Sequence, residues 1–218
     1  YQRATAAIDW LWQMTDPITG DVPNLGANDG AQLLQLSGSG YRDFRPSVQF
    51  ATALFLKQRK YSKECNYLLE WFGLEVDSLT AMEEQRTSKL FENGGYASLI
   101  GEFCSGILRF PHFRFRPSHA DLMHLEIMDH GIPVVRDGGS YSYNTDAKWL
   151  NYFPGVESHN TIEFDHSEPM PRLSHFLFGE WPEIDFQEWN VAKNVTRWSG
   201  RYQDYLGRSH QRTVQLHG

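Results

Sequence analysis

Histidines gather in the middle of this chain, where seven of the nine lie between His112 and His175. Three residues of this region, His119, Asp137 and His159, offer two imidazole nitrogens and a carboxylate oxygen, a usual ligand set for zinc. The alternative for each histidine by itself is an ordinary buried or surface side chain. The zinc hypothesis therefore depends on elements that bring the three residues together.

A β-hairpin is expected to position two of these residues. Apolar alternation predicts strands at residues 122–128 and 132–136, and the sequence DHG at 129–131 predicts the turn between them. His119 and Asp137 then lie on adjacent strands, so we expect their side chains to converge.

The third metal candidate is expected on another strand. His159 stands directly before a predicted strand at residues 160–165. Of the neighbouring histidines, His124 is interpreted as a sheet-facing partner and His130 as a turn residue, so neither is taken as a ligand.

The first part of the chain has a helical period. Apolar residues recur at helical spacing up to Asp16-Pro17, and serines precede further predicted helices at 48–59 and 63–72. The predicted N-caps are Ser47 and Ser62, and the tryptophans expected in a core are Trp10, Trp12 and Trp71.

A long connection, residues 21–46, is rich in Gly, Asn and Ser. Loops of this length are usually functional or disordered, and its leucine and aromatic content favours an ordered one. The sequence NDG at 28–30 is a turn signal. We therefore interpret its polar residues as structural first: Asn24, Asn28, Asp29 and Arg42.

The character of the chain changes near residues 75–92. Residues 96–116 predict two strands with a break at 104–106, and further strands are predicted at 189–198 and 210–216. Glycine and proline residues occur in the segments between these predicted strands. This pattern favours helices first and an antiparallel β-sandwich second.

Composition limits the functions that are open to the chain. Its 218 residues are 40% hydrophobic and 14% aromatic, which argues against disorder, and its net charge of −7 argues against nonspecific nucleic-acid binding. Two cysteines are too few for a disulfide framework, and no apolar run reaches the length of a membrane span. The chain opens within a helical pattern and ends in a strand-like run, so we expect it to be part of a longer protein.

Four segments, in this order, resemble the heparinase II/III-like polysaccharide lyase family. They are PNLGANDG with YRDFRP at 23–46, FRFRPSHADLMHLEI at 113–127, VRDGGSYSYN at 135–144 and SHNTIEFD at 158–165. The resemblance implies an α+β multidomain fold, in which an incomplete (α/α) toroid precedes an antiparallel β-sandwich. Residues 1–80 would be the end of the toroid, and residues 81–218 an incomplete sandwich domain.

The resemblance also implies an activity, the β-elimination of an acidic polysaccharide that contains uronic acid. Such a reaction needs a group that neutralises the uronate carboxylate, a base for the adjacent C–H proton and an acid for the departing oxygen. The catalytic candidates on the sandwich side are Tyr143 and Tyr152. Related lyases often carry a catalytic histidine two positions before the metal histidine, where this chain has Pro117. The family's other catalytic residues lie earlier in the toroid.

The resemblance further implies a structural zinc ion held by His119, Asp137 and His159, and a periplasmic or secreted location. A local cluster of positive charge would bind the acidic polysaccharide despite the negative net charge. Its members are Arg109, Arg114, Arg116 and Arg136. The residues predicted to bind the polysaccharide are Arg114, Arg116 and Arg136, with Trp149 expected to stack on a sugar ring.

Two other classes of protein remain open. The first is a non-catalytic carbohydrate-binding or structural sandwich module of an exopolysaccharide-related protein, which Pro117 would suit. The second is a cupin-like metal oxygenase, which fits the two histidines and the aspartate but not the long helical lead-in.

Overall fold

The computed structural model describes residues 1–28, 30–31, 34–61, 65–82 and 85–217. The chain forms two compact units. One comprises Tyr1–Val22 and Gly30–Arg86, and the other comprises Pro23–Asp29 and Thr87–Gly218. A short segment of the long connection thus belongs to the second unit, although both of its flanks belong to the first.

The first unit is mainly helical, with α1 (Gln2–Met14), α2 (Arg45–Leu56) and α3 (Tyr67–Trp71). Helices α1 and α2 pack on each other and bury Trp12 and Val48. Two short strands, β1 (Gln58–Arg59) and β2 (Thr80–Ala81), pair in parallel, and the 3-10 helix η2 (Val76–Ser78) lies just before β2. The (α/α) toroid stays a prediction.

Four local predictions for the first 86 residues are corrected or fall outside the described residues. Helix α2 begins at Arg45 with Pro46 in its first turn and Phe44 as N-cap, so Ser47 is not the cap. Trp71 is 72% exposed rather than in a core. The predicted cap Ser62 and the turn residue Asp29 lie outside the described residues.

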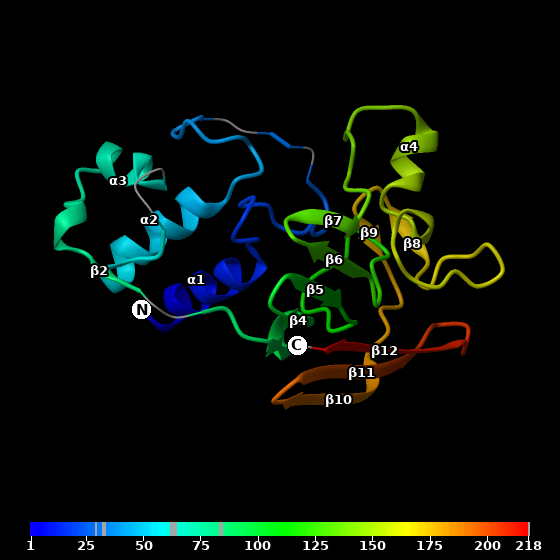
Figure 1. The fold of residues 1–218 in the computed structure, drawn as a ribbon. Helices are drawn as coiled ribbons and strands as arrows, with labels where there is room; N and C mark the ends of the chain where they lie inside the picture. The colour runs from blue at the N-terminus through cyan, green and yellow to red at the C-terminus, as the bar shows by residue number, and fades with distance from the viewer. Residues whose placement is uncertain (29, 32–33, 62–64, 83–84, 218) are drawn as a thin grey trace. The chain divides into compact units, whose positions relative to one another are not determined.

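Among its described residues the second unit contains three antiparallel sheets, and Figure 1 shows the two larger ones as separate layers. The five-stranded sheet follows chain order: β3 (Lys89–Phe91), β4 (Tyr96–Ile100), β5 (Cys104–Arg109), β6 (Leu125–Asp129) and β7 (Ile132–Val135). The three-stranded sheet comprises β10 (Ile184–Ala192), β11 (Val195–Gln203) and β12 (Ser209–His217). The 3-10 helix η3 (Glu92–Gly94) joins β3 to β4. Between β7 and β10 lie four shorter elements, of which the last two pair with each other: α4 (Ala147–Tyr152), η4 (Val156–Ser158), β8 (Arg172–Ser174) and β9 (Leu177–Phe178).

The two sheets share one hydrophobic core. Ala97 of β4 lies opposite Leu108 of β5, which lies opposite Leu125 of β6, so these side chains form a row on one face of the larger sheet. The row packs in the same cluster as Trp198 and Tyr202 of β11. This arrangement is an antiparallel sandwich, as the alternating apolar positions predict.

Strand boundaries in the sandwich differ from the prediction at several places. The strand predicted at 122–128 begins only at Leu125. The break predicted at 104–106 lies at 101–103, because Cys104, Ser105 and Gly106 pair with β6. Residues 160–165 form no strand and contribute only a bridge between Phe164 and Ser167. The segment 189–198 is a hairpin of β10 and β11 rather than one strand.

Among the described residues, no helix is both long and apolar enough to cross a bilayer.

The buried His210 should make the sandwich sensitive to acid. Burial, with help from nearby Arg212, lowers the pKa of His210 to about 4 from an ordinary 6.5. The folded state therefore disfavours the protonated ring, and stability present above pH 6.5 is lost as pH falls toward 4, by roughly 3 kcal/mol. We predict that His210→Leu flattens the dependence of unfolding free energy on pH, measured by urea denaturation. His166→Leu, at an exposed turn, is the control, and an equal dependence in both variants would contradict the prediction.

Candidate metal centre

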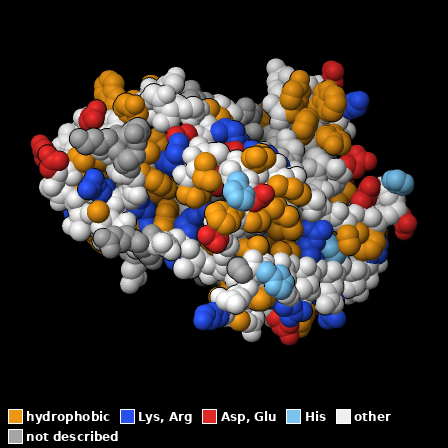
Figure 2. All heavy atoms as spheres, viewed as in Figure 1, with side chains coloured by type: hydrophobic (Ala, Val, Ile, Leu, Met, Phe, Trp, Pro, Cys, Tyr) orange, Lys and Arg blue, Asp and Glu red, His pale blue; other side chains and the backbone are white. Residues whose placement is uncertain are grey.

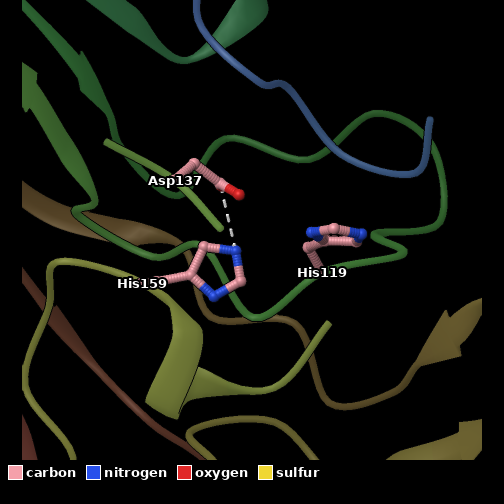
Figure 3. Close-up of side chains that lie close together, drawn as sticks. All are labelled: His119, Asp137 and His159. Carbon is pink, nitrogen blue, oxygen red and sulfur yellow. Dashed lines mark ion pairs between the residues drawn. The ribbon is translucent and has the colours of Figure 1, made fainter. Parts of the chain in front are cut away.

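His119, Asp137 and His159 come together from three separate segments of the sandwich unit. One possible ligand atom from each residue lies within 4.8 Å of the other two, and Figure 3 shows the side chains turned toward one another. All three residues are buried, with exposed fractions of 3%, 4% and 8% respectively. The convergence expected from the sequence is therefore present.

The elements that carry these residues differ from the prediction. His119 lies in the loop between β5 and β6 rather than on a strand, and His159 directly follows η4 rather than starting a strand. Asp137 follows the end of β7. Backbone hydrogen bonds hold the loops together: Ala120 N–H donates to the Pro154 carbonyl at 2.8 Å, and the N–H of residue 138 donates to the carbonyl of residue 158 at 3.3 Å.

A tight turn fixes Asp137 after β7. Its Oδ1 accepts a hydrogen bond from the Gly139 N–H at 2.6 Å, and Gly139 has a φ of +72°, which favours glycine. The Asp137 Oδ2 remains directed at the His159 ring, 3.1 Å from Nε2. One carboxylate oxygen thus holds the turn and the other faces the cluster.

His159 uses Nδ1 for a backbone hydrogen bond, and its Nε2 faces Asp137. Its Nδ1 lies 2.7 Å from the Gly155 carbonyl oxygen, an acceptor, so Nδ1 carries a proton. Nε2 lies close to Asp137 but forms no hydrogen bond among the described residues. Burial opposes charge on this ring, but the adjacent Asp137 carboxylate outweighs it and raises the pKa of His159. For Asp137, burial is likewise outweighed by His159, which lowers the carboxyl pKa.

The His119 ring is in the neutral form that a metal ligand requires. Burial, followed by the nearby His159, lowers its pKa to about 4, so the ring is uncharged at neutral pH. Its buried Nδ1 has no hydrogen-bond partner among the described residues, whereas Nε2 lies 3.3 Å from Ser140 Oγ. A proton on Nε2 would donate to Ser140 and leave the Nδ1 lone pair open to a cation.

An outer layer of hydrogen bonds supports Asp137. The Glu126 Oε1 accepts from the backbone N–H of Asp137 at 3.2 Å and of Asn24 at 3.1 Å. The Asn24 side-chain Nδ2 in turn donates to the Asp137 carbonyl at 3.0 Å. Asn24, interpreted from sequence as structural, therefore helps to hold a metal candidate.

The same segment supports His119. The Ala27 N–H donates to Ser118 Oγ at 3.2 Å, and the Asn28 N–H donates to Ser140 Oγ at 2.8 Å. Sequence reasoning identified neither Ser140 nor Glu126. The only signal for Glu126 is a carboxylate between two apolar strand residues, which is also the pattern of a solvent-facing position.

The arrangement fits a zinc ion. Two imidazole nitrogens that have no hydrogen-bond partner in the described part of the chain and an ionised carboxylate oxygen are the donors that zinc prefers. Zinc–ligand distances of roughly 2.0–2.2 Å place tetrahedral ligands about 3.5 Å apart, so binding would draw these side chains slightly inward.

Residues 83–218 match the family model described as Heparinase II/III-like, C-terminal. This match covers more than half of the chain. The chain belongs to the heparinase II/III-like family. A comparison with curated proteins finds no match.

Solved structures of lyases share the fold of this heparinase II/III-like chain. A mutant of the heparan sulfate lyase HepC from Pedobacter heparinus aligns with a TM-score of 0.64 at 15% identity, covering 98% of this chain and 30% of that one. A heparinase III with methylated lysines has a TM-score of 0.64 at 15% identity, covering 95% and 29%. A further heparinase III structure has a TM-score of 0.60 at 16% identity, covering 97% and 31%. The chain thus spans about 30% of the length of these structures.

The two candidate tyrosines of this heparinase-like chain lie in different surroundings. Tyr143 lines a small cavity together with His119 and packs edge-on against Phe176, with ring centroids 5.0 Å apart. Tyr152 ends α4 and packs edge-on against Trp149 at 6.1 Å. The structure therefore brings Tyr143, but not Tyr152, into a cavity with a metal candidate.

Trp149 belongs to an aromatic cluster around α4. Its ring lies 5.8 Å from Phe153 and 6.1 Å from Tyr141, which is 63% exposed and has a left-handed backbone with a φ of 58°. The Lys148 Nζ lies 4.7 Å from the Trp149 ring centroid. Figure 2 shows hydrophobic side chains gathered at the surface over α4.

The three candidate arginines have different surroundings. Arg114 is exposed and donates to Asn93 Oδ1 at 2.7 Å. Arg116 is exposed and lines a hollow that also includes His119. Arg136 is half-buried between β7 and Asp137.

We predict that His119, Asp137 and His159 bind one zinc ion. His159→Ala should weaken zinc binding by at least about 100-fold, because it removes one of three protein ligands. The measurement is competition with a chromophoric chelator. In the unsubstituted chain, zinc at 100 times its Kd should stabilise the fold by about 2.7 kcal/mol. His130→Ala, in an exposed turn, is the control, and zinc binding that survives His159→Ala would exclude this site.

A second prediction concerns the support of Asp137 by Glu126. Glu126→Ala should weaken zinc binding about tenfold, because two backbone N–H groups lose their acceptor. Glu126→Gln should bind zinc nearly as well as the unsubstituted chain, because the amide oxygen still accepts both bonds. Glu157→Ala, at an exposed position, is the control in the same chelator competition. Equal affinities for the Ala and Gln variants would contradict the proposed support.

Proposed function

We propose that this chain is part of a polysaccharide lyase that cleaves an acidic polysaccharide containing uronic acid by β-elimination. The observation that carries the proposal is the match of residues 83–218 to the heparinase II/III-like C-terminal family. The similar solved structures are named as a heparan sulfate lyase and heparinase III. Because the chain spans about 30% of their length, the activity is proposed for the whole enzyme.

The proposed reaction breaks a glycosidic C–O bond without water. A base takes the proton from the carbon next to the uronate carboxylate, and that electron pair forms a carbon–carbon double bond as the glycosidic oxygen departs. The departing oxygen takes a proton from an acid. Tyr143 is our candidate for proton transfer, because its side chain lines a cavity with His119. Tyr152 is the weaker candidate, because it packs in the α4 aromatic cluster.

Zinc held by His119, Asp137 and His159 would supply a structural cross-link between three loops. The protein's own part is to orient these loops: Glu126 and Asn24 hold the Asp137 backbone, and Ser140 orients the His119 ring. Fixing these loops would also fix the Tyr143 cavity, whose lining includes His119 and Ser140.

The polysaccharide would be held by charge and by stacking. Arg114 and Arg116 are exposed and would attract carboxylate groups, with salt weakening the attraction through screening. Arg136 is half-buried and is the weakest of the three candidates. Trp149, with exposed Tyr141 beside it, would stack against a sugar ring.

The test is ultraviolet absorbance of the unsaturated uronate product during incubation with uronate polymers. It should use both this chain and the longest natural protein that contains it. Tyr143→Phe should reduce the rate by about 10²–10⁴-fold, because the ring loses its transferable proton, whereas Tyr152→Phe should retain activity.

Binding of the polymer without unsaturated product, in both forms of the protein, would overturn the lyase proposal. That outcome would favour a carbohydrate-binding module, the function that Pro117 at the position of a catalytic histidine would suit.

A further inference from the structure

The three-stranded sheet contacts the loops of the candidate metal centre through two arginines. Arg212 lies on β12, and Arg208 lies in the turn between β11 and β12. Both residues are half-buried, and each donates hydrogen bonds to backbone carbonyls outside its own sheet. Charge-assisted bonds of this kind are stronger than bonds between neutral groups, so the two arginines are able to hold loops in place.

Arg212 joins the loop that carries His119 to the segment that carries His159. Its Nη1 donates to the Met123 carbonyl at 2.7 Å and to the Asn160 carbonyl at 2.8 Å. Met123 lies in the same β5–β6 loop as His119, and Asn160 directly follows His159. One cationic group shared by two carbonyls therefore fixes the spacing between the two histidine-bearing segments.

The backbone held by this arginine needs such support. Met123 is fully buried and has a left-handed φ of 56°, which a residue other than glycine keeps only where its surroundings enforce it. The same two segments are joined again nearby, because the Asn160 N–H donates to His124 Nδ1 at 2.8 Å and the Thr161 hydroxyl donates to the Leu122 carbonyl. These bonds between neutral groups are individually weaker than the charge-assisted ones.

A second route to the metal centre runs from Arg208 through Glu168. The Arg208 guanidinium donates to the carbonyls of Phe164 and Glu168, each at 3.1 Å. Asp204, which is 6% exposed, fixes the guanidinium in turn, with its Oδ2 2.6 Å from Arg208 Nε. The segment that carries Glu168 is therefore anchored to the β11–β12 turn.

The Glu168 side chain fixes the turn that orients His159. Its two carboxylate oxygens lie 3.1 and 3.3 Å from the backbone nitrogen of Val156. The preceding carbonyl, that of Gly155, accepts from His159 Nδ1 at 2.7 Å while Nε2 faces Asp137. A Cβ at position 155 would lie 2.6 Å from Glu168 Oε1 and 2.9 Å from a backbone carbonyl oxygen, so this close approach requires glycine.

We propose that Arg208 and Arg212 are positioning residues for zinc, which hold the histidine-bearing segments at the spacing that binding requires. Both layers of the sandwich then assemble the metal centre, because the five-stranded sheet presents Asp137 and the three-stranded sheet sets the positions of the histidines. The proposal rests on the zinc site of the proposed function. It adds that zinc binding and the docking of the β11–β12 hairpin stabilise each other.

The test is the zinc affinity of the full chain, measured by competition with a chromophoric chelator. Arg212→Ala should raise the Kd for zinc about tenfold or more, because the two segments lose their shared donor. Arg212→Lys should restore most of the affinity, since the contacts come from one nitrogen and an ammonium group offers three donors. Arg201→Ala, which removes an exposed arginine of β11 that pairs with Asp185, is the matched control and should leave the Kd unchanged.

Amide hydrogen exchange in the zinc-free protein separates positioning from a general loss of stability. In Arg212→Ala, exchange should accelerate more at Asn160, whose N–H is bonded to His124 Nδ1, than at Trp198 in the middle of the central strand β11. Equal acceleration at both amides reports lower global stability and would overturn the proposal.

If Arg212→Ala does not fold, Glu168→Ala replaces it and should also weaken zinc binding. Glu168→Gln is then the rescue variant, because its amide oxygen still accepts from the Val156 N–H. An unchanged zinc Kd in the alanine variant, or no zinc binding by the unsubstituted chain, would overturn the proposal. Unsaturated product is followed separately, so zinc binding that depends on Arg212 without cleavage would count against the lyase proposal alone.

Discussion

The contact between the buried Asp137 carboxylate and the His159 imidazole is the interaction on which the loops of the sandwich depend. It joins the end of β7 to the segment after η4, two parts of the chain with few backbone hydrogen bonds between them. Each charged form is disfavoured by burial, and each is favoured by the other. Removing one partner would leave an uncompensated buried group, which is more costly than the pair itself.

Near this contact, three buried histidine nitrogens have no hydrogen-bond partner among the described residues: His119 Nδ1, His124 Nε2 and His159 Nε2. His119 Nδ1 offers a lone pair with no donor, which suits a cation beside Asp137.

Local patterns predicted the parts of the fold that local forces determine. The β6–β7 hairpin turns at His130, as expected, because alternation and the following glycine act over only a few residues. Helical spacing at Trp71 identified a helix but not whether another element covers its face, so the predicted burial was wrong.

The residue types of the metal candidates could be recognised in the sequence, but their supporting contacts could not. His119 and His159 lie in loops whose shape depends on contacts between distant segments, so strand patterns misplaced them. The role of Glu126 depends on Asn24, which is 102 positions away. A hydrogen bond between residues so far apart produces no periodic pattern in a single sequence.

The placement of Pro23–Asp29 among the strands has a consequence for the order of folding. The polypeptide leaves the helical unit after residue 22, returns at residue 30 and leaves again after residue 86. Asn24 emerges early in synthesis, but its partner Asp137 lies 113 residues later. Closing so long a loop costs chain entropy and slows folding. The outer support of the metal loops is therefore expected to be among the last contacts to form. A protein cut at the start of the family match, residue 83, would lack Asn24 and with it that support.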